Sequence, residues 1–423
     1  MILVRKSGLE LMSIDQISRI INVEDVDRKK CTGCKMCADI CPKSAITFDY
    51  DNEGFWFPHV DGEECINCKK CACSCPAINS SAIFNSAQNM KCYGLWNKAD
   101  DIRWQSTSGG FFTALANHLL SQEWYVSGAI YDSQMRVKHI VTNKLARIAE
   151  LRQSKYAQSD TEKIYARIKD LLNQDKKVFF CGTPCQVEAL YFLLGRRHEN
   201  LLTMDFICCG ISSPVVFERY LQWQEKRYRS KVTKVWFKNK SAGWSSIGTQ
   251  VSFANGKQYF RTGNREPYMI SFVTDGNNIR NSCFQCKYRH VPHVGDFTAG
   301  DFWGIGTIYP EYDDNKGITA LMINTDAGYD AFTNIKDQLN EFSCSIDAIA
   351  AGNFTIYKPK MPREDRHAFL CCVKALGFIK AIRKYSSYSG KNRMRINFTH
   401  YRKNFRSMVK MLLSHVAGVA PEK

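Results

Sequence analysis

Residues 31–42 read Cys31-Thr-Gly-Cys34-Lys-Met-Cys37-Ala-Asp-Ile-Cys41-Pro42, and residues 65–76 repeat the pattern as Cys65-Ile-Asn-Cys68-Lys-Lys-Cys71-Ala-Cys73-Ser-Cys75-Pro76. Both runs have the spacing C-x2-C-x2-C-x3-C-P, which binds [4Fe-4S] clusters. Three cysteines of one run hold a cluster, and the cysteine before the proline ligates the other cluster. The spacing therefore predicts one cluster on Cys31, Cys34, Cys37 and Cys75, and a second on Cys65, Cys68, Cys71 and Cys41.

Two other uses of these cysteines are disfavoured. Structural zinc takes four ligands in paired knuckles, whereas eight cysteines here fall in two matching runs. Disulfides are typical of secreted proteins, and we expect this 423-residue chain with 19 cysteines to be cytoplasmic, because it shows no secretory signal. Cys73 interrupts the strict pattern, and we expect it to be a small core residue.

The chain divides into regions of different composition. We expect an N-terminal extension over 1–24, an α+β ferredoxin-like module over 25–79 and an α/β body in two parts, 92–170 and 171–345. Within the module, alternating residues at 45–50 and 55–58 predict a hairpin. A basic helical tail over 360–423 completes the chain.

The tail carries most of the excess positive charge. The formal net charge is +17, and residues 361–423 contain 14 Lys and Arg against 3 Asp and Glu. Basic and apolar residues alternate at helical spacing over 377–384 and 392–411. Peripheral contact with an anionic membrane and a helix pair docked on the protein itself both fit this pattern. We expect no nucleic-acid binding, because no recognition motif accompanies the charge, and no membrane span, because no long apolar run occurs.

The body contains ligand-binding signals where strands and turns lead into helices. Ser106-Thr-Ser-Gly-Gly110 precedes a helix predicted over 111–120, where it can act as a cap or bind a phosphate. A strand over 177–180 runs through Cys181-Gly-Thr-Pro-Cys-Gln186 into a helix over 187–194. A second strand starts at Leu201, and Ser212-Ser-Pro214 opens another helix. Turns at the carboxyl ends of such strands are where α/β proteins bind ligands.

A further cysteine pair, Cys283-Phe-Gln-Cys286, needs two more ligands to form a metal site. Cys185 and either Cys208 or Cys209 lie on turns that can supply them, and the alternative is a set of buried free cysteines. The glycine-rich segment 295–304 offers Asp296 and Asp301 as acidic groups, for which turn stabilisation is the favoured role. No catalytic residue is assigned.

Several motifs occur in an order that resembles the β-subunit family of coenzyme F420 hydrogenases and dehydrogenases. They are STSGG (106–110), SKYAQS (154–159), CGTPCQ (181–186), the Cys-Gly turn leading to Ser-Pro (208–214), FKNKSAGW (237–244), SCFQCKYR (282–289) and GDFTAGDFWG (295–304). The resemblance covers about 92–325. It implies a bound flavin, FAD, and in some members an additional [4Fe-4S] cluster.

Carried over by motif, the resemblance assigns cofactor-binding roles to Ser108, Gly109, Gly110, Lys155, Thr183, Pro184 and Gln186. It assigns a third cluster to Cys185, Cys208, Cys283 and Cys286, with Cys209 as the alternative to Cys208. For Lys155 the other interpretation is an ordinary surface lysine.

We therefore expect an iron-sulfur flavoprotein oxidoreductase. A ferredoxin-like donor would pass electrons through the clusters to the flavin, which exchanges one electron with clusters and two with organic acceptors. Many bacterial relatives of this family lie outside deazaflavin chemistry and occur among genes for cell-surface polysaccharide synthesis. The resemblance therefore disfavours a deazaflavin substrate and suggests a role in that synthesis, and it leaves the acceptor open. Two alternatives remain, a non-catalytic electron-transfer subunit of a larger complex and a membrane-surface accessory of polysaccharide assembly.

Overall fold

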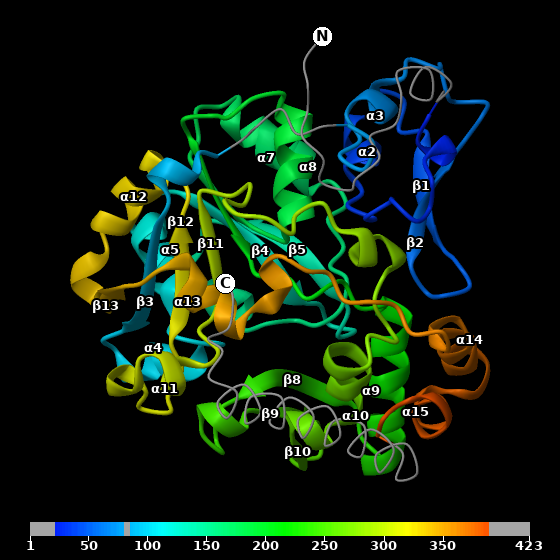
Figure 1. The fold of residues 1–423 in the computed structure, drawn as a ribbon. Helices are drawn as coiled ribbons and strands as arrows, with labels where there is room; N and C mark the ends of the chain where they lie inside the picture. The colour runs from blue at the N-terminus through cyan, green and yellow to red at the C-terminus, as the bar shows by residue number, and fades with distance from the viewer. Residues whose placement is uncertain (1–21, 80–84, 389–423) are drawn as a thin grey trace, which may run out of the picture.

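The computed structural model describes residues 22–79 and 85–388 (Figure 1). Most of the predicted N-terminal extension and the basic stretch 392–411 lie outside the described residues. None of the described helices has the length and apolar character needed to cross a membrane.

The N-terminal module is a small α+β unit with internal pseudo-repetition. It contains the hairpin of β1 (Ile46–Tyr50) and β2 (Trp56–Val60), which confirms the predicted pair of strands. Short helices α2 (Met36–Ile40) and α3 (Lys70–Cys73) follow the two cysteine loops. Each helix is preceded by a lysine in the left-handed region, with φ of 64° at Lys35 and 58° at Lys69. The repeated sequence therefore produces a repeated loop geometry.

The body is built on one eight-stranded sheet of order β13-β3-β12-β11-β7-β6-β4-β5. The central strands β11, β7, β6 and β4 are parallel, and the outer pairings are antiparallel, so the sheet is mixed. The strands are β3 (Lys91–Asn97), β4 (Tyr125–Tyr131), β5 (Val137–Thr142), β6 (Val178–Cys181), β7 (Leu201–Phe206), β11 (Phe297–Asp301), β12 (Thr319–Ile323) and β13 (Leu339–Ser343). The predicted parts 92–170 and 171–345 share this sheet, because β3 pairs with both β12 and β13.

Helices cover both faces of the sheet, as the α/β prediction requires. Phe179 packs with α5 on one face, and its neighbours Val178 and Phe180 pack with α7 and α8 on the other, because successive strand side chains point to opposite faces. The helices along the sheet are α4 (Asp100–Gln105), α5 (Phe111–Ser121), α6 (Ile148–Leu151), α7 (Ile164–Leu172), α8 (Pro184–Leu194), α11 (Ile305–Ile308), α12 (Asp326–Thr333) and α13 (Ile346–Gly352).

The helices predicted over 111–120 and 187–194 and the strands at 177–180 and 201 are confirmed. Helix α8 begins at Pro184, three residues earlier than predicted. Proline is favoured at a first helical position, and the Gln186 side-chain oxygen accepts the Thr183 N–H at 2.9 Å, which fixes that start.

A second, three-stranded antiparallel sheet lies below the main sheet in Figure 1. It contains β8 (Val232–Asn239), β9 (Gly248–Phe253) and β10 (Gln258–Thr262), and it packs with α9 (Pro214–Tyr228) and α10 (Pro267–Met269). The aromatic side chains Phe55 and Phe57 of the N-terminal module join the same apolar cluster. The module is therefore attached to the body through a shared core.

The described part of the predicted tail forms α14 (Arg366–Leu376) and α15 (Phe378–Tyr385), which pack on α9. Phe369, Phe378 and Ile382 are fully buried in this packing. Between 366 and 385 the apolar face of the tail thus lies against the protein itself.

Candidate functional site

The eight cysteines of the two runs gather in two separate groups of four. Cys31, Cys34, Cys37 and Cys75 line one cavity of about 20 Å³. Cys41, Cys65, Cys68 and Cys71 line another cavity of about 20 Å³. In each group one cysteine comes from the opposite run, which is the crossed arrangement expected for two cubes.

The chemistry of these groups fits thiolate ligands of clusters. Burial raises the pKa of Cys34 to about 11 and that of Cys37 well above its usual value. Ligand cysteines must be deprotonated, so cluster binding has to drive proton release at these sites. Among the described residues no three His, Cys, Asp or Glu side chains form a site for a single metal ion. Thiolates around a cube bind different irons and so stand farther apart than ligands of one ion.

The two groups differ in their distance from the body. Cys68 of the second group is exposed, whereas Cys34 of the first group packs against the apolar cluster that contains Cys185, Cys283 and Cys286. The second group is therefore the outer one. Cys73 is also exposed, so its predicted place in the core is wrong; it faces solvent from the single turn of α3.

A third group of cysteines lies inside the body. Cys185 lies in the first turn of α8, and Cys208 follows β7. Cys283 lies within a 3-10 helix over Asn281–Gln285, and Cys286 directly follows that helix. Burial raises the pKa of Cys185 and Cys208 well above the usual thiol value, and each lies near the charges of Cys283 and Cys286. Cys209 contacts Thr355 instead, with its Sγ 4.0 Å from the hydroxyl. The structure thus brings together the four predicted residues and leaves Cys209 outside.

Backbone amides point at two sulfurs of this third group. The Gly210 N–H donates to the Cys208 Sγ at 3.4 Å, and the Ile211 N–H donates to the Cys283 Sγ at 3.3 Å. Such N–H to sulfur bonds favour thiolates and tune cluster potentials. The residues present therefore fit a third cluster.

Beside this third group lies a cavity of about 310 Å³ at the carboxyl ends of β6 and β7. Ser108, Gly110, Lys155, Thr183 and Gln186 line it, and so do Cys208 and Cys209. Gly109 and Pro184 do not line it. A Cβ on Gly109 would stand 2.2 Å from the Leu95 carbonyl oxygen, so this glycine permits the close approach of the SGG loop to β3. The lining is mostly apolar with a few polar groups, as in cofactor sites.

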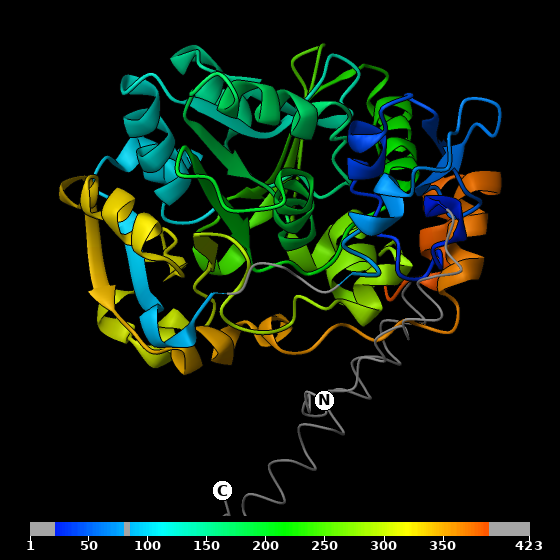
Figure 2. The same cartoon turned by 90° about the horizontal axis from the view of Figure 1, so that it is seen from above.

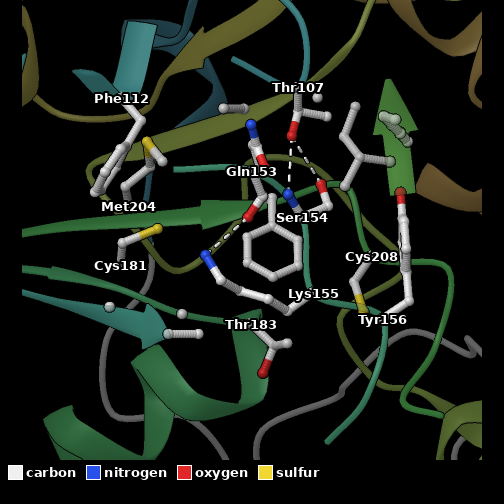
Figure 3. A pocket seen from close by; sticks show the side chains of 18 of the residues that line it. Thr107, Phe112, Gln153, Ser154, Lys155, Tyr156, Cys181, Thr183, Met204 and Cys208 are labelled. Atoms are coloured by element: carbon white, nitrogen blue, oxygen red, sulfur yellow. Dashed lines mark hydrogen bonds between the residues drawn. The ribbon is translucent and has the colours of Figure 1, made fainter. Parts of the chain in front are cut away.

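Lys155 is a partly buried cation on the cavity wall rather than a surface lysine. Its Nζ donates to the carbonyl oxygens of Glu150 at 2.8 Å, Arg152 at 2.6 Å and Gln153 at 3.2 Å. Burial lowers its pKa to about 7. Figure 3 shows the Lys155 side chain between Gln153 and Thr183, its nitrogen pointing toward Gln153. The three carbonyl oxygens account for its three hydrogens, and the protonated side chain adds positive charge to the cavity wall.

The two acidic candidates have different surroundings. Asp296 lies away from the cavity and accepts the N–H and the hydroxyl of Thr203, each at 2.7 Å, which is the structural role favoured by the sequence. Asp301 lines the cavity and pairs with Lys238. Lys238, Tyr156 and Trp303 are cavity residues that the sequence did not single out, although all three lie in the quoted motifs.

Gln158 and Arg280 tie the cavity loop to the first cysteine group. The Gln158 amide donates to the Thr32 carbonyl at 3.0 Å, and Arg280 donates to the Cys31 carbonyl at 2.8 Å and to Gln158 at 3.2 Å. Arg280 is 1% exposed. Figure 2 shows the N-terminal module, in blue, at one end of the body, where α2 contacts α7 and α8.

The site and fold together define an iron-sulfur redox protein, with a dicluster module joined to an α/β body that holds a deep cavity. Residues 30–79 match the family model of the 4Fe-4S dicluster domain. Residues 175–343 match the model for the C-terminal part of the beta subunit of coenzyme F420 hydrogenase/dehydrogenase. The chain therefore contains a region similar to the 4Fe-4S dicluster domain, which implies two clusters, and a region similar to the C-terminal part of that beta subunit.

Other comparisons give little more. No curated protein matches the chain. A chain of the F420-reducing [NiFe] hydrogenase complex from Methanosarcina barkeri, in a xenon-derivatised structure, matches with a TM-score of 0.43 and 14% identity, covering 65% of this chain and 93% of that chain.

Proposed function

We propose that the protein is an iron-sulfur flavoprotein oxidoreductase that relays electrons from a ferredoxin-like donor to an organic acceptor. The observation that best supports this proposal is the order of the sites. The outer cysteine group is followed by the inner group, which contains Cys34, then by the third group and then by the cavity. Cys34 of the inner group packs in the same apolar cluster as Cys185 and Cys283, and Cys208 lines the cavity.

The proposed flavin is FAD, bound in the cavity of about 310 Å³. Lys155 and the amino-terminal end of α5 would meet its phosphates, with Ser108 and Gly110 beside them and Thr183 and Gln186 on the wall. When bound, a flavin exchanges single electrons with clusters and pairs of electrons with organic molecules. Phe111, Met204 and Phe272 are buried apolar residues of the cavity wall, and they would shield part of a bound flavin from water. A role in cell-surface polysaccharide synthesis follows from the resemblance to bacterial relatives, and reduction of coenzyme F420 is the family alternative.

A second candidate is a subunit that hands electrons to a partner protein. The exposed side chains Val273, Phe354, Tyr357 and Met361 favour it, because Phe272 and Asn353 next to them line the cavity. Membrane contact through the tail concerns residues beyond 388. Loss of liposome binding when residues 389–423 are removed would support it.

Anaerobic purification followed by measurement of iron, acid-labile sulfide and flavin distinguishes the first two. About twelve irons and one FAD per chain support three cubes that feed a flavin. About eight irons without flavin contradict the enzyme and support the transfer subunit.

A further inference from the structure

A buried ion pair stands on the wall of the cavity, away from Lys155. Lys238 of β8 pairs with Asp301 at the end of β11, and the side chains are 12% and 7% exposed. Burial alone would lower the pKa of Lys238, but Asp301 and Tyr156 raise it, so the ammonium stays charged. The pair joins the small sheet to the large one, and it also places a cation at the cavity.

The Lys238 ammonium and the Tyr156 hydroxyl can each donate a further hydrogen bond into the cavity. An ammonium has three hydrogens; Asp301 accepts one from Lys238, and the Tyr156 hydroxyl oxygen interacts with the same ammonium. Because the Tyr156 hydroxyl oxygen takes part in the contact with Lys238, the hydroxyl hydrogen can be donated to a ligand. Burial raises the pKa of Tyr156, which keeps the phenol protonated, although Lys238 works in the opposite direction. Leaving such donors unsatisfied in a buried site costs free energy that a ligand oxygen would recover.

Aromatic rings frame the two donors. Trp303 lines the cavity and stacks on the buried Trp244, with ring centroids 4.9 Å apart and an interplanar angle of 11°. The Tyr156 ring is held by Phe237 and Phe272, at centroid distances of 5.3 and 5.4 Å. Figure 3 shows Tyr156 beside Cys208, across the cavity from Phe112 and Cys181. These surfaces suit a flat ring system.

We propose that Tyr156, Lys238 and Trp303 form a subsite for a planar conjugated carbonyl compound. The carbonyl oxygen would accept from the Tyr156 hydroxyl and the Lys238 ammonium, and the ring would lie against Trp303. Binding of such a compound can be tested by itself. Its role as the electron acceptor rests on the proposed function. Donors placed at a carbonyl oxygen stabilise the negative charge that develops there on reduction.

Asp301 sets the charge class of the ligand. Its carboxylate neutralises Lys238, so a carboxylate or phosphate at the same place would meet like charge as well as the ammonium. An uncharged carbonyl oxygen meets only the remaining hydrogen of Lys238 and the phenol. The subsite therefore favours a neutral acceptor, in contrast to Lys155, whose ammonium is held by backbone carbonyls rather than by a carboxylate.

A matched pair of probes tests the subsite. We would measure binding of 2,3-dimethyl-1,4-naphthoquinone and of 2,3-dimethylnaphthalene to the oxidised holoprotein by anaerobic equilibrium dialysis. The ring carbon atoms next to the carbonyls are blocked, which prevents addition of cysteine thiols. We expect the quinone to bind at least about tenfold more tightly than the hydrocarbon, which corresponds to about 1.4 kcal/mol.

Single substitutions assign the effect to residues. Tyr156→Phe and Lys238→Met should each reduce quinone affinity about tenfold without changing that of the hydrocarbon, because each removes one donor. Trp303→Ala should weaken both probes. The control is Tyr131→Phe, which removes another buried hydroxyl that has no partner among the described residues and does not line the cavity.

Equal affinity for the two probes, failure of the protein to bind them, or equal effects of Tyr156→Phe and Tyr131→Phe would overturn the subsite. Iron and flavin contents, measured on every variant, report separately on the proposed function. Normal contents with no carbonyl preference contradict the subsite alone, whereas a wild type without flavin contradicts the relay.

Discussion

At the scale of single residues, burial gives Lys155 a pKa far below that of an ordinary lysine. Its Nζ is held by three backbone carbonyls, and its pKa is lowered to about 7 by burial. The pKa of an unfolded lysine is near 10.5, so the folded protein releases this proton first. The free energy of unfolding should therefore rise with pH between about 7 and 10.5 on account of this group.

The same titration predicts how FAD binding depends on pH. Protonated Lys155 attracts phosphate, so the affinity for FAD should fall as the pH rises through about 7. Lys155→Met should lower the affinity about tenfold at pH 6 and remove this pH dependence. Quenching of flavin fluorescence measures both, with the exposed Lys144→Met as the control. A wild-type affinity that is independent of pH would contradict the assigned role.

Neighbouring cysteines offer a direct test of the third cluster. Cys208 lies near Cys283 and Cys286, whereas the Cys209 Sγ lies 4.0 Å from the Thr355 hydroxyl. Cys208→Ser should lower the iron content by about four atoms per chain, and Cys209→Ser should leave it unchanged. Iron analysis and electron paramagnetic resonance of the reduced protein give the answer. Equal loss in the two variants would show that the assignment to Cys208 is wrong.

At the scale of elements, α14 and α15 belong to the folded core. Their buried faces meet α9 in a cluster with several aromatic contacts, among them Phe378 on Tyr220 at 5.4 Å and on Trp223 at 5.9 Å between centroids. The hydrophobic periodicity of the tail is thus used internally between 366 and 385. The basic side chains of Lys380, Arg383 and Lys384 stay exposed on the outer face of α15.

Phe378→Ala should reduce the free energy of unfolding by about 3–5 kcal/mol, because it empties a fully buried site. Leu376→Ala, two residues earlier and 58% exposed, should change it by less than about 0.5 kcal/mol. Urea denaturation followed by circular dichroism compares the two variants. Similar small effects would show that α15 does not dock on α9 in solution.

At the scale of the whole molecule, Arg280 links the module to the body. It is buried and donates to the carbonyls of Cys31 and Trp56, at 2.8 and 3.0 Å, and to the side chain of Gln158. These contacts bridge about 250 residues of sequence, since Cys31 and Arg280 are separated by 249 positions. The proposed relay would depend on such a link, because Arg280 holds the inner cysteine group against the body.

Arg280→Ala should destabilise the protein by at least about 3 kcal/mol, because several buried carbonyl and amide oxygens lose their donor. It should also slow flavin reduction when electrons enter through the module. Stopped-flow reduction by a ferredoxin measures the rate, and the exposed Arg196→Ala is the control. An unchanged rate in a destabilised variant would limit Arg280 to a structural role.

The sequence by itself determined the two groups of four cysteines in the dicluster module, the hairpin between the two cysteine runs and the main strand-to-helix turns. These features depend on local spacing: a C-x2-C-x2-C loop can close around one cluster, and a strand, a glycine or proline turn and a capped helix are encoded in adjacent residues. Only the tertiary structure decided that β3 lies between β12 and β13, that Cys208 rather than Cys209 faces Cys283, and that Lys238 meets Asp301 beside Tyr156. Each of these contacts joins residues far apart in the chain, and their pairing depends on how the sheet and its covering helices pack, which no local pattern specifies.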